Sequence, residues 1–173
     1  EDTTVRMWRV ANGDCLREFS TGAAVCAVAF HPVNSNILLF GDVRRGLACA
    51  NVSVGKDAAR CMSVRDVVSA VFDQTGTVVF AATRSGHVDV LQLQERHQET
   101  HNWELTLWHA YPLVATKRAA LDNEDFQSGS CRMVYTAWLK EFGGPALMVP
   151  WTDRSVRLFS WDSSSMSAEC QPS

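Results

Sequence analysis

The sequence predicts an all-β fold made of repeated four-stranded antiparallel sheets, and three observations predict it. Short strand-like runs recur at a nearly constant spacing, turn residues separate them, and no convincing amphipathic helix lies between them. Met133–Phe142 is the one stretch whose pattern tempts a helical assignment. A period of about 40–45 residues with four strands is typical of a β-propeller, a ring of four-stranded blades.

Two independent registers give the period. In the first, β-runs that follow a turn begin at positions 5, 47, 88 and 156, so two nearly equal steps precede a longer one. In the second, Val28–Phe30 precedes His31-Pro32, and Ala70–Phe72 precedes Asp73–Gly76. The step from position 28 to position 70 equals the step from 5 to 47, and this agreement indicates a structural repeat. The runs of the first register are Val5–Trp8, Leu47–Ala50, Val88–Leu91 and Val156–Phe159.

Each complete period divides into four predicted strands with polar or glycine-containing turns between them. The first complete set is 25–30, 37–41, 47–54 and 59–64, separated by turns at 34–36, 44–46 and 55–57. The next set is 67–72, 78–83, 88–93 and 104–108.

These strands divide the chain into parts of one propeller. We expect the end of one blade at 1–20, whole blades at 21–66 and 67–110, and a blade at 111–162 that carries an insertion at 122–144. The segment 163–173 is either a polar, serine-rich tail or the start of a last strand. Because a closed ring takes typically four to eight blades, we expect an incomplete ring and, as partners, the remaining blades of a full-length chain.

Two segments carry a resemblance to a known family. Asp2–Trp8, with Gly13 five residues after Trp8 and then Cys15–Phe19, resembles the turn, third strand, turn and fourth strand of WD-repeat proteins. Asp153–Phe159 is similar, with phenylalanine in the tryptophan position. The middle repeats have Ala50 and Leu91 in that position, and no repeat has the usual Gly-His pair. The resemblance implies a WD-type propeller whose buried Asp, His, Ser/Thr and Trp network is incomplete.

Several residues are expected to have structural roles. The apolar residues of the repeated runs are expected to pack between blades rather than to hold a cofactor, and no cofactor is expected. Asp2 and Asp153 each precede a third strand, where a carboxylate can accept backbone N–H groups and stabilise a tight turn. The packing positions are Val5, Trp8, Phe30, Phe72, Leu91 and Phe159.

A cluster of arginines is the first candidate site. In WD propellers the loops between second and third strands gather on one face with the loops between blades, which here places four turn arginines together. Arginine suits protein contacts because its planar fork pairs with carboxylates and stacks on aromatic rings. We therefore expect acidic peptides or acidic protein surfaces as partners, although any single turn arginine is more simply solvated. The four are Arg44, Arg45, Arg84 and Arg154.

The insertion at 122–144 is the second candidate site, because long loops on a rigid repeat scaffold often carry function. It contains Tyr135 and Trp138. These side chains either anchor a partner or pack back on the blade as a hairpin or a short helix.

Composition excludes several classes of function. The formal net charge is −3 with both signs scattered, so direct binding of nucleic acid is disfavoured. The longest apolar run, Ala23–Phe30, has eight residues, too few for a membrane span. Six cysteines occur singly without a C-x-x-C pair, which predicts buried free thiols and a nuclear or cytoplasmic location.

Catalytic and metal sites find little support. His97 and His101 are spaced for zinc on a helix, but they lack the H-E-x-x-H pattern and a third ligand, and their context predicts a hairpin loop. His31, before Pro32, is most simply a turn residue. No nucleophile elbow, phosphate loop or dinucleotide motif occurs.

The sequence therefore predicts a non-enzymatic scaffold for protein–protein interaction in a regulatory complex, in a nuclear or cytoplasmic setting. The alternative is a substrate-recognition subunit of a ubiquitin ligase, for which no adaptor-binding segment is recognisable. A propeller-based enzyme is the least favoured, because no repeated pattern of carboxylates or histidines marks the strand starts.

Overall fold

The computed structural model describes residues 3–61, 64, 66–83, 87–97, 102–112, 135–139, 144–150, 156–162 and 167–170. Side chains are described for 3–55, 64, 66–83, 87–96 and 103–107. Regular structure in these parts is β-strand throughout. Within them, nothing forms a helix of the length and apolarity needed to cross a membrane.

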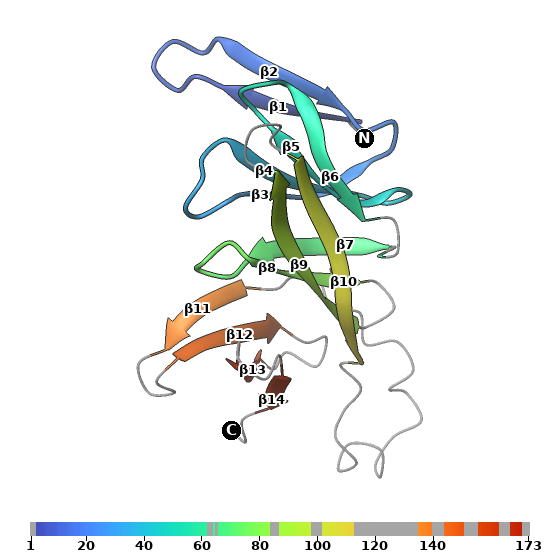
Figure 1. The fold of residues 1–173 in the computed structure, drawn as a ribbon, viewed down its shortest axis with the longest axis vertical. Helices are drawn as coiled ribbons and strands as arrows, with labels where there is room; N and C mark the ends of the chain where they lie inside the picture. The colour runs from blue at the N-terminus through green and yellow to red at the C-terminus, as the bar shows by residue number, and fades with distance from the viewer. Residues whose placement is uncertain are drawn as a thin grey trace.

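The described strands form one two-stranded and three four-stranded antiparallel sheets, which follow one another along the chain (Figure 1). In each four-stranded sheet, neighbouring strands are also consecutive in sequence. Sheet 1 contains β1 (Thr4–Trp8) and β2 (Cys15–Ser20). Sheet 2 contains β3 (Val25–Phe30), β4 (Ile37–Asp42), β5 (Gly46–Asn51) and β6 (Lys56–Cys61). Sheet 3 contains β7 (Val67–Phe72), β8 (Val78–Thr83), β9 (His87–His97) and β10 (Asn102–Pro112). Sheet 4 contains β11 (Tyr135–Leu139), β12 (Gly144–Pro150), β13 (Val156–Asp162) and β14 (Ser167–Cys170).

Strand β4 shows why these sheets stack. All six of its residues are buried, so its apolar residues do not alternate with polar ones. Ile37 and Leu39 join the core shared with sheet 3, whereas Leu38 and Phe40 pack with residues of sheet 1. Successive side chains of a strand point to opposite faces, so a strand covered on both faces is apolar on both, as Ile37–Phe40 are. Asp42, at the end of the strand, is also buried.

The main core of the described residues lies between sheets 2 and 3. Leu39 and Leu47 of sheet 2 meet Val79 and Leu91 of sheet 3, and each of these four side chains is fully buried. Burying one such side chain contributes roughly 1.5–3 kcal/mol, so this interface is a large source of stability.

Sheets 2 and 3 repeat one another in detail at the predicted spacing. Each first strand carries a bulge at the equivalent place, between Val25 and Ala27 in β3 and between Val67 and Ser69 in β7. The turn after β3 is closed by the His31 N–H, which donates to the Ile37 carbonyl (3.0 Å). The turn after β7 is closed in the same way by the N–H of Asp73 and the carbonyl of Val78 (2.9 Å).

Residues 135–139 differ from the helical alternative considered for the insertion. They form β11, which pairs with β12 in an antiparallel hairpin and begins sheet 4. The end of the predicted insertion is therefore a strand. The sequence did not reveal this because the run has no counterpart at the repeat spacing. In the same sheet, Ser167–Cys170 forms the last strand, β14.

Candidate functional site

The turn between β4 and β5 presents two of the predicted arginines. Asp42 closes β4 and is buried, and its Oδ1 accepts the backbone N–H groups of Arg44 (2.9 Å) and Arg45. Gly46 follows with a φ of +80°, a conformation that side chains other than glycine rarely adopt. The Asp42 carboxylate and Gly46 thus hold the turn rigidly, with the exposed side chains of Arg44 and Arg45 at its tip.

The loop between sheets 1 and 2 lies against this turn. The ideal Cβ position on Gly22 is 3.0 Å from the Arg45 Nη2, so the guanidinium rests on this glycine. The Val43 N–H donates to the Ala24 carbonyl (3.1 Å), and the buried Thr21 hydroxyl lies 2.7 Å from the Thr3 carbonyl. Figure 1 shows both loops on the same side of the stacked sheets. We call Gly22, Arg44 and Arg45 the arginine surface.

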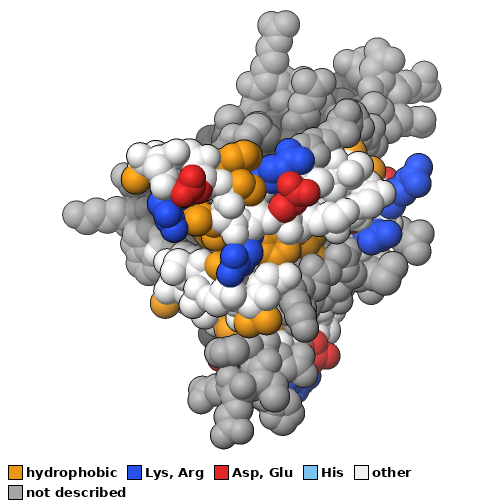
Figure 2. Space-filling view, turned by 90° about the horizontal axis from the view of Figure 1, so that it is seen from above, with side chains coloured by type: hydrophobic (Ala, Val, Ile, Leu, Met, Phe, Trp, Pro, Cys, Tyr) orange, Lys and Arg blue, Asp and Glu red, His pale blue; other side chains and the backbone are white. Residues whose placement is uncertain are grey.

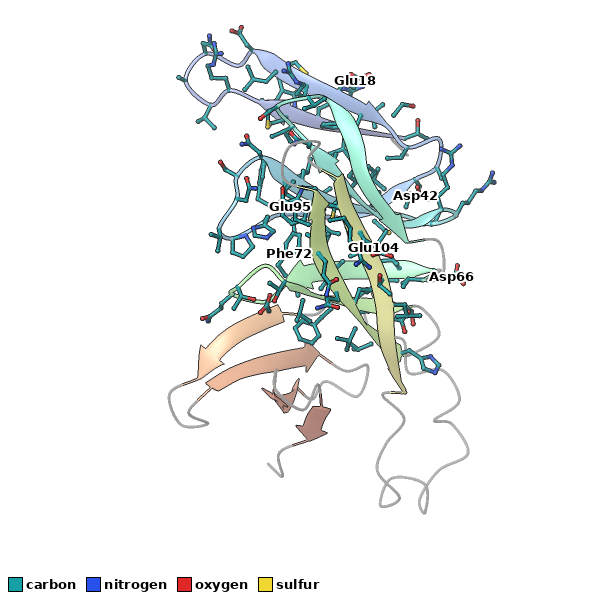
Figure 3. The ribbon with its side chains drawn as sticks, in the orientation of Figure 1. Glu18, Asp42, Asp66, Phe72, Glu95 and Glu104 are labelled. Carbon is teal, nitrogen blue, oxygen red and sulfur yellow. The ribbon has the colours of Figure 1, made fainter. Side chains whose placement is uncertain are left out.

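The electrostatics of the arginine surface are simple. Within the part of the chain that the structure describes, the Arg44 and Arg45 guanidiniums make no ion pair or hydrogen bond. Figure 3 places Asp42 and Asp66 along this side of the molecule; the Asp42 side chain is buried in its turn and Asp66 is exposed. Two cationic groups are therefore available here for an anionic partner.

The structure places the other predicted contact residues as follows. Arg84 and Arg154 lie outside the described residues, so the structure brings together only two of the four arginines. Tyr135 and Trp138 lie on β11, described as backbone only. Both residues therefore lie on the first strand of sheet 4, and their contact with a partner stays a prediction.

The predicted structural residues divide into three groups. Phe72 is buried, whereas Trp8 and Phe30 are more than half exposed among the described residues, and their packing between blades stays a prediction. Phe159 lies on β13, paired with Leu147 and Cys170, and its side chain is not described. Asp2 and Asp153 lie outside the described residues.

His31 was interpreted only as a turn residue, and the structure gives it a larger role. Its Nδ1 accepts the backbone N–H groups of Val33 (3.1 Å) and Asn34 (2.9 Å). Its ring lies 5.0 Å from that of Phe72, and a Cβ on Gly76 would overlap it. His31 thus joins the first turn of sheet 2 to the first turn of sheet 3. The available sequence signal was its position, one repeat before Asp73.

Burial shifts the pKa of three titratable side chains, those of His31, Cys49 and Asp89. Burial lowers the pKa of His31, and its hydrogen bond to the Gly76 backbone and the charge of Asp73 oppose this shift in part. Because both ring nitrogens are engaged, His31 is not a free general base. Burial raises the pKa of the Asp89 carboxyl, with an opposing effect of His87, and raises the pKa of the Cys49 thiol to about 12.

The described residues contain free thiols but no cluster of side chains suited to bind a metal ion. Cys15, Cys26 and Cys49 are free thiols, and Cys15 is exposed, against the expectation that the thiols are buried. Within the described residues, no three His, Cys, Asp or Glu side chains cluster as metal ligands do. His97 is described as backbone only and His101 lies outside the described residues.

Known structures identify the fold. No protein-family model matches the chain. It is similar to a chain in the crystal structure of the mitotic checkpoint complex (TM-score 0.63, 15% identity), covering 90% of this chain and 42% of that one. It is also similar to the C-terminal WD40 domain of Sif2 (TM-score 0.62, 13% identity), covering 90% of this chain and 39% of that one. The predicted fold class is thereby confirmed: an all-β propeller of four-stranded antiparallel blades of WD40 type. The chain spans about two-fifths of these structures and forms an incomplete ring.

Proposed function

We propose that this chain is part of a WD-repeat propeller that acts as a non-enzymatic scaffold for protein–protein interaction, and that the arginine surface binds acidic peptides or acidic protein surfaces. One observation carries the proposal: two exposed guanidiniums without a described partner stand on a turn that the buried Asp42 holds rigid. A preorganised turn lowers the entropy cost of binding.

The proposed setting of the scaffold is a regulatory complex in the nucleus or cytoplasm. One structural neighbour belongs to a multiprotein complex, in keeping with a role in assembly for this fold. Residues 1–93 resemble the WD-repeat protein conventionally numbered thirteen, through the segments Phe30–Asn36 and Asn51–Lys56. We place the protein in the nucleus or cytoplasm, within a regulatory complex, because free thiols suit a reducing compartment. The scattered charge gives no stripe for nucleic acid.

The test uses a fluorescein-labelled decaglutamate peptide and a variant that carries Arg44→Glu and Arg45→Glu. Reversing two charges turns attraction into repulsion, so the variant should bind at least about tenfold more weakly at low salt. Affinity purification with the same two proteins, followed by mass spectrometry, then identifies natural partners that depend on this surface.

The matched control reverses two arginines elsewhere, with Arg9→Glu and Arg96→Glu, which changes the net charge equally. Arg9 pairs with Asp14 across the β1–β2 turn, and Arg96 pairs with Glu104 between β9 and β10. If the control loses as much affinity as the arginine-surface variant, binding follows net charge alone and the proposed surface is wrong.

A further inference from the structure

Arg45 differs from the other arginines whose side chains the structure describes. Arg6, Arg9 and Arg96 each pair with a carboxylate of this chain. Arg17 donates to backbone carbonyls. Within the described residues, the Arg45 guanidinium makes no such bond, yet it lies in contact with a neighbouring loop. Its position is therefore defined while its N–H donors stay available.

The contact that positions Arg45 involves Gly22, in the loop between sheets 1 and 2. An ideal Cβ on Gly22 would lie 3.0 Å from Nη2, 3.3 Å from Cζ and 3.6 Å from Nη1 of Arg45. These three distances fit a point above the flat side of the guanidinium rather than in its plane. Gly22 also has a φ of +71°, so both its backbone and its close neighbour favour glycine. The contact covers one flat side and leaves the N–H groups in the plane of the guanidinium uncovered.

The next repeat is built without this contact. The bulges of β3 and β7 align Gly22 with Val64, which is fully buried. The pairing of β5 and β9 with the strands before them aligns Arg45 with Gly86. The loop and the turn thus have glycine and arginine in one repeat, and valine and glycine in the next. Sheet 3 forms without an arginine at this place, so the repeat does not require the contact of Arg45 with Gly22.

Positive charge alone does not distinguish this place. Figure 2 looks down on sheet 1 and shows Lys and Arg side chains at several places around the described surface rather than in one patch. A mobile cationic side chain attracts an anion of any shape. A guanidinium held in one orientation favours a group that fits its two parallel N–H donors, and a planar carboxylate is such a group. Geometry rather than charge therefore sets Arg45 apart.

We infer that Arg45 is the specificity-determining residue of the arginine surface: its guanidinium binds one side-chain carboxylate of an acidic segment through two parallel N–H···O bonds. This inference rests on the proposed function of the arginine surface. Gly22 is the positioning residue, because a side chain at this place would displace the guanidinium. Within the described residues, no hydrogen bond or ion pair holds the Arg44 guanidinium. Arg44 therefore contributes charge without a fixed geometry, and it loses more side-chain freedom than Arg45 when a ligand binds.

The test uses the whole chain and fluorescein-labelled decaglutamate with an amidated C-terminus, which offers side-chain carboxylates only. Lysine keeps the charge of arginine but lacks the planar pair of donors. Arg45→Lys should therefore bind about tenfold more weakly at low salt, because one of two charge-assisted hydrogen bonds is lost. The matched variant Arg44→Lys should bind within about twofold of the parent chain. A labelled glycine–serine decapeptide with a free C-terminus should not bind.

The positioning role of Gly22 is tested in a double-mutant cycle. Gly22→Ala should weaken binding by the parent chain but have little further effect when position 45 already carries lysine, a coupling that a merely structural role would not produce. Gly13→Ala is the matched control, since Gly13 has a φ of +75° and its Cβ would meet nothing within 4 Å. This control has the same backbone cost and should bind as the parent chain does. Far-ultraviolet circular dichroism checks that every variant is folded.

The possible failures of this inference can be told apart from a failure of the proposed function. Equal binding by the two lysine variants, or equal binding by the two alanine variants, would overturn the inference and leave the proposed function standing. Binding of the glycine–serine peptide as tightly as decaglutamate would assign the site to a terminal carboxylate and overturn the inference as well. A parent chain that does not bind decaglutamate would overturn both.

Discussion

Phe30 and Phe72 hold the same position in consecutive repeats, yet one is exposed and the other is buried. Both end the first strand of their sheet, and both face the preceding sheet. Phe72 meets a four-stranded sheet and the ring of His31, whereas Phe30 faces the two-stranded sheet 1. The same residue type at the same repeat position is thus buried against a neighbouring sheet in one place and exposed in the other.

The difference shows that a repeat position predicts which way a side chain points but not whether anything covers it. In stacked repeats each unit depends on its neighbour for half of its burial, so stability is a property of the interface between units. Breaking the interface of sheets 2 and 3 should therefore be costly, and equivalent changes toward sheet 1 should be tolerated.

The largest expected effect comes from truncating the two phenylalanines. Phe72→Ala should lower the free energy of unfolding by about 3–5 kcal/mol, because it leaves a cavity in the main core. Phe30→Ala should cost less than about 1 kcal/mol, since the side chain is already largely in water. Urea unfolding followed by circular dichroism measures both. Equal losses would mean that the Phe30 face is covered in solution.

A second contrast uses two glycines with the same backbone conformation. Gly76 and Gly13 have φ values of +79° and +75°, but a Cβ on Gly76 would overlap the His31 ring, while a Cβ on Gly13 meets nothing within 4 Å. Gly13→Ala should cost about 1–2 kcal/mol for the left-handed backbone alone. Gly76→Ala should cost roughly a further 1–3 kcal/mol, because the ring must move away from Phe72. Similar urea midpoints for the two variants would show that the His31 ring is not held there.

The sequence predicted sheets 2 and 3 almost completely, because both carry the repeat period and turn residues such as Gly46 and Gly76. Strand ends differ from prediction in two places. The predicted strands 47–54 and 59–64 are Gly46–Asn51 and Lys56–Cys61, so the predicted turn at 55–57 lies partly inside β6. The structure also extends β9 and β10 to His87–His97 and Asn102–Pro112. The hairpin of these two strands extends beyond the repeated core. The length of such an extension depends on pairing between the two strands, and no local sequence pattern predicts it. The first strand of sheet 4 was missed for the same reason.

The candidate site was predictable in part. The arrangement of loops in WD propellers predicts that Arg44 and Arg45 lie on one face with the loops between blades, and the Arg45 guanidinium does rest on Gly22 in such a loop. The exposure of Phe30 and the role of His31 could not be predicted, since both depend on contacts between sheets that lie a whole repeat apart in sequence.

The contact of His31 with sheet 3 should make stability depend on pH. The pKa of folded His31 lies below its ordinary value of 6.5, so the unfolded chain takes up the proton first. The stabilising contribution is therefore complete above pH 6.5 and is lost as the pH falls through the folded pKa. Protonation of Nδ1 also breaks the two bonds from Val33 and Asn34.

Urea unfolding of the parent chain and of His31→Asn between pH 7.5 and 5 measures this dependence. Asparagine keeps an acceptor for the turn but does not titrate, so the variant should show a flatter dependence than the parent. Asp73 is the charged group that faces His31, and it is present in both proteins. Parallel curves would assign the pH dependence to other groups and remove His31 from this role.

The smallest effect is expected on the outer side of sheet 1. The Arg6–Glu18 ion pair is short, at 2.7 Å, but 38% and 52% of the two side chains is exposed. Exposed pairs of this kind contribute roughly 0.2–1 kcal/mol, so Glu18→Gln should lower the free energy of unfolding by no more than that. The loss should shrink further in about 0.5 M salt, which screens exposed charges strongly. A loss of several kcal/mol in urea unfolding would mean that this side of sheet 1 is buried in solution. The contrast between the buried interface of sheets 2 and 3 and the exposed sheet 1 would then disappear.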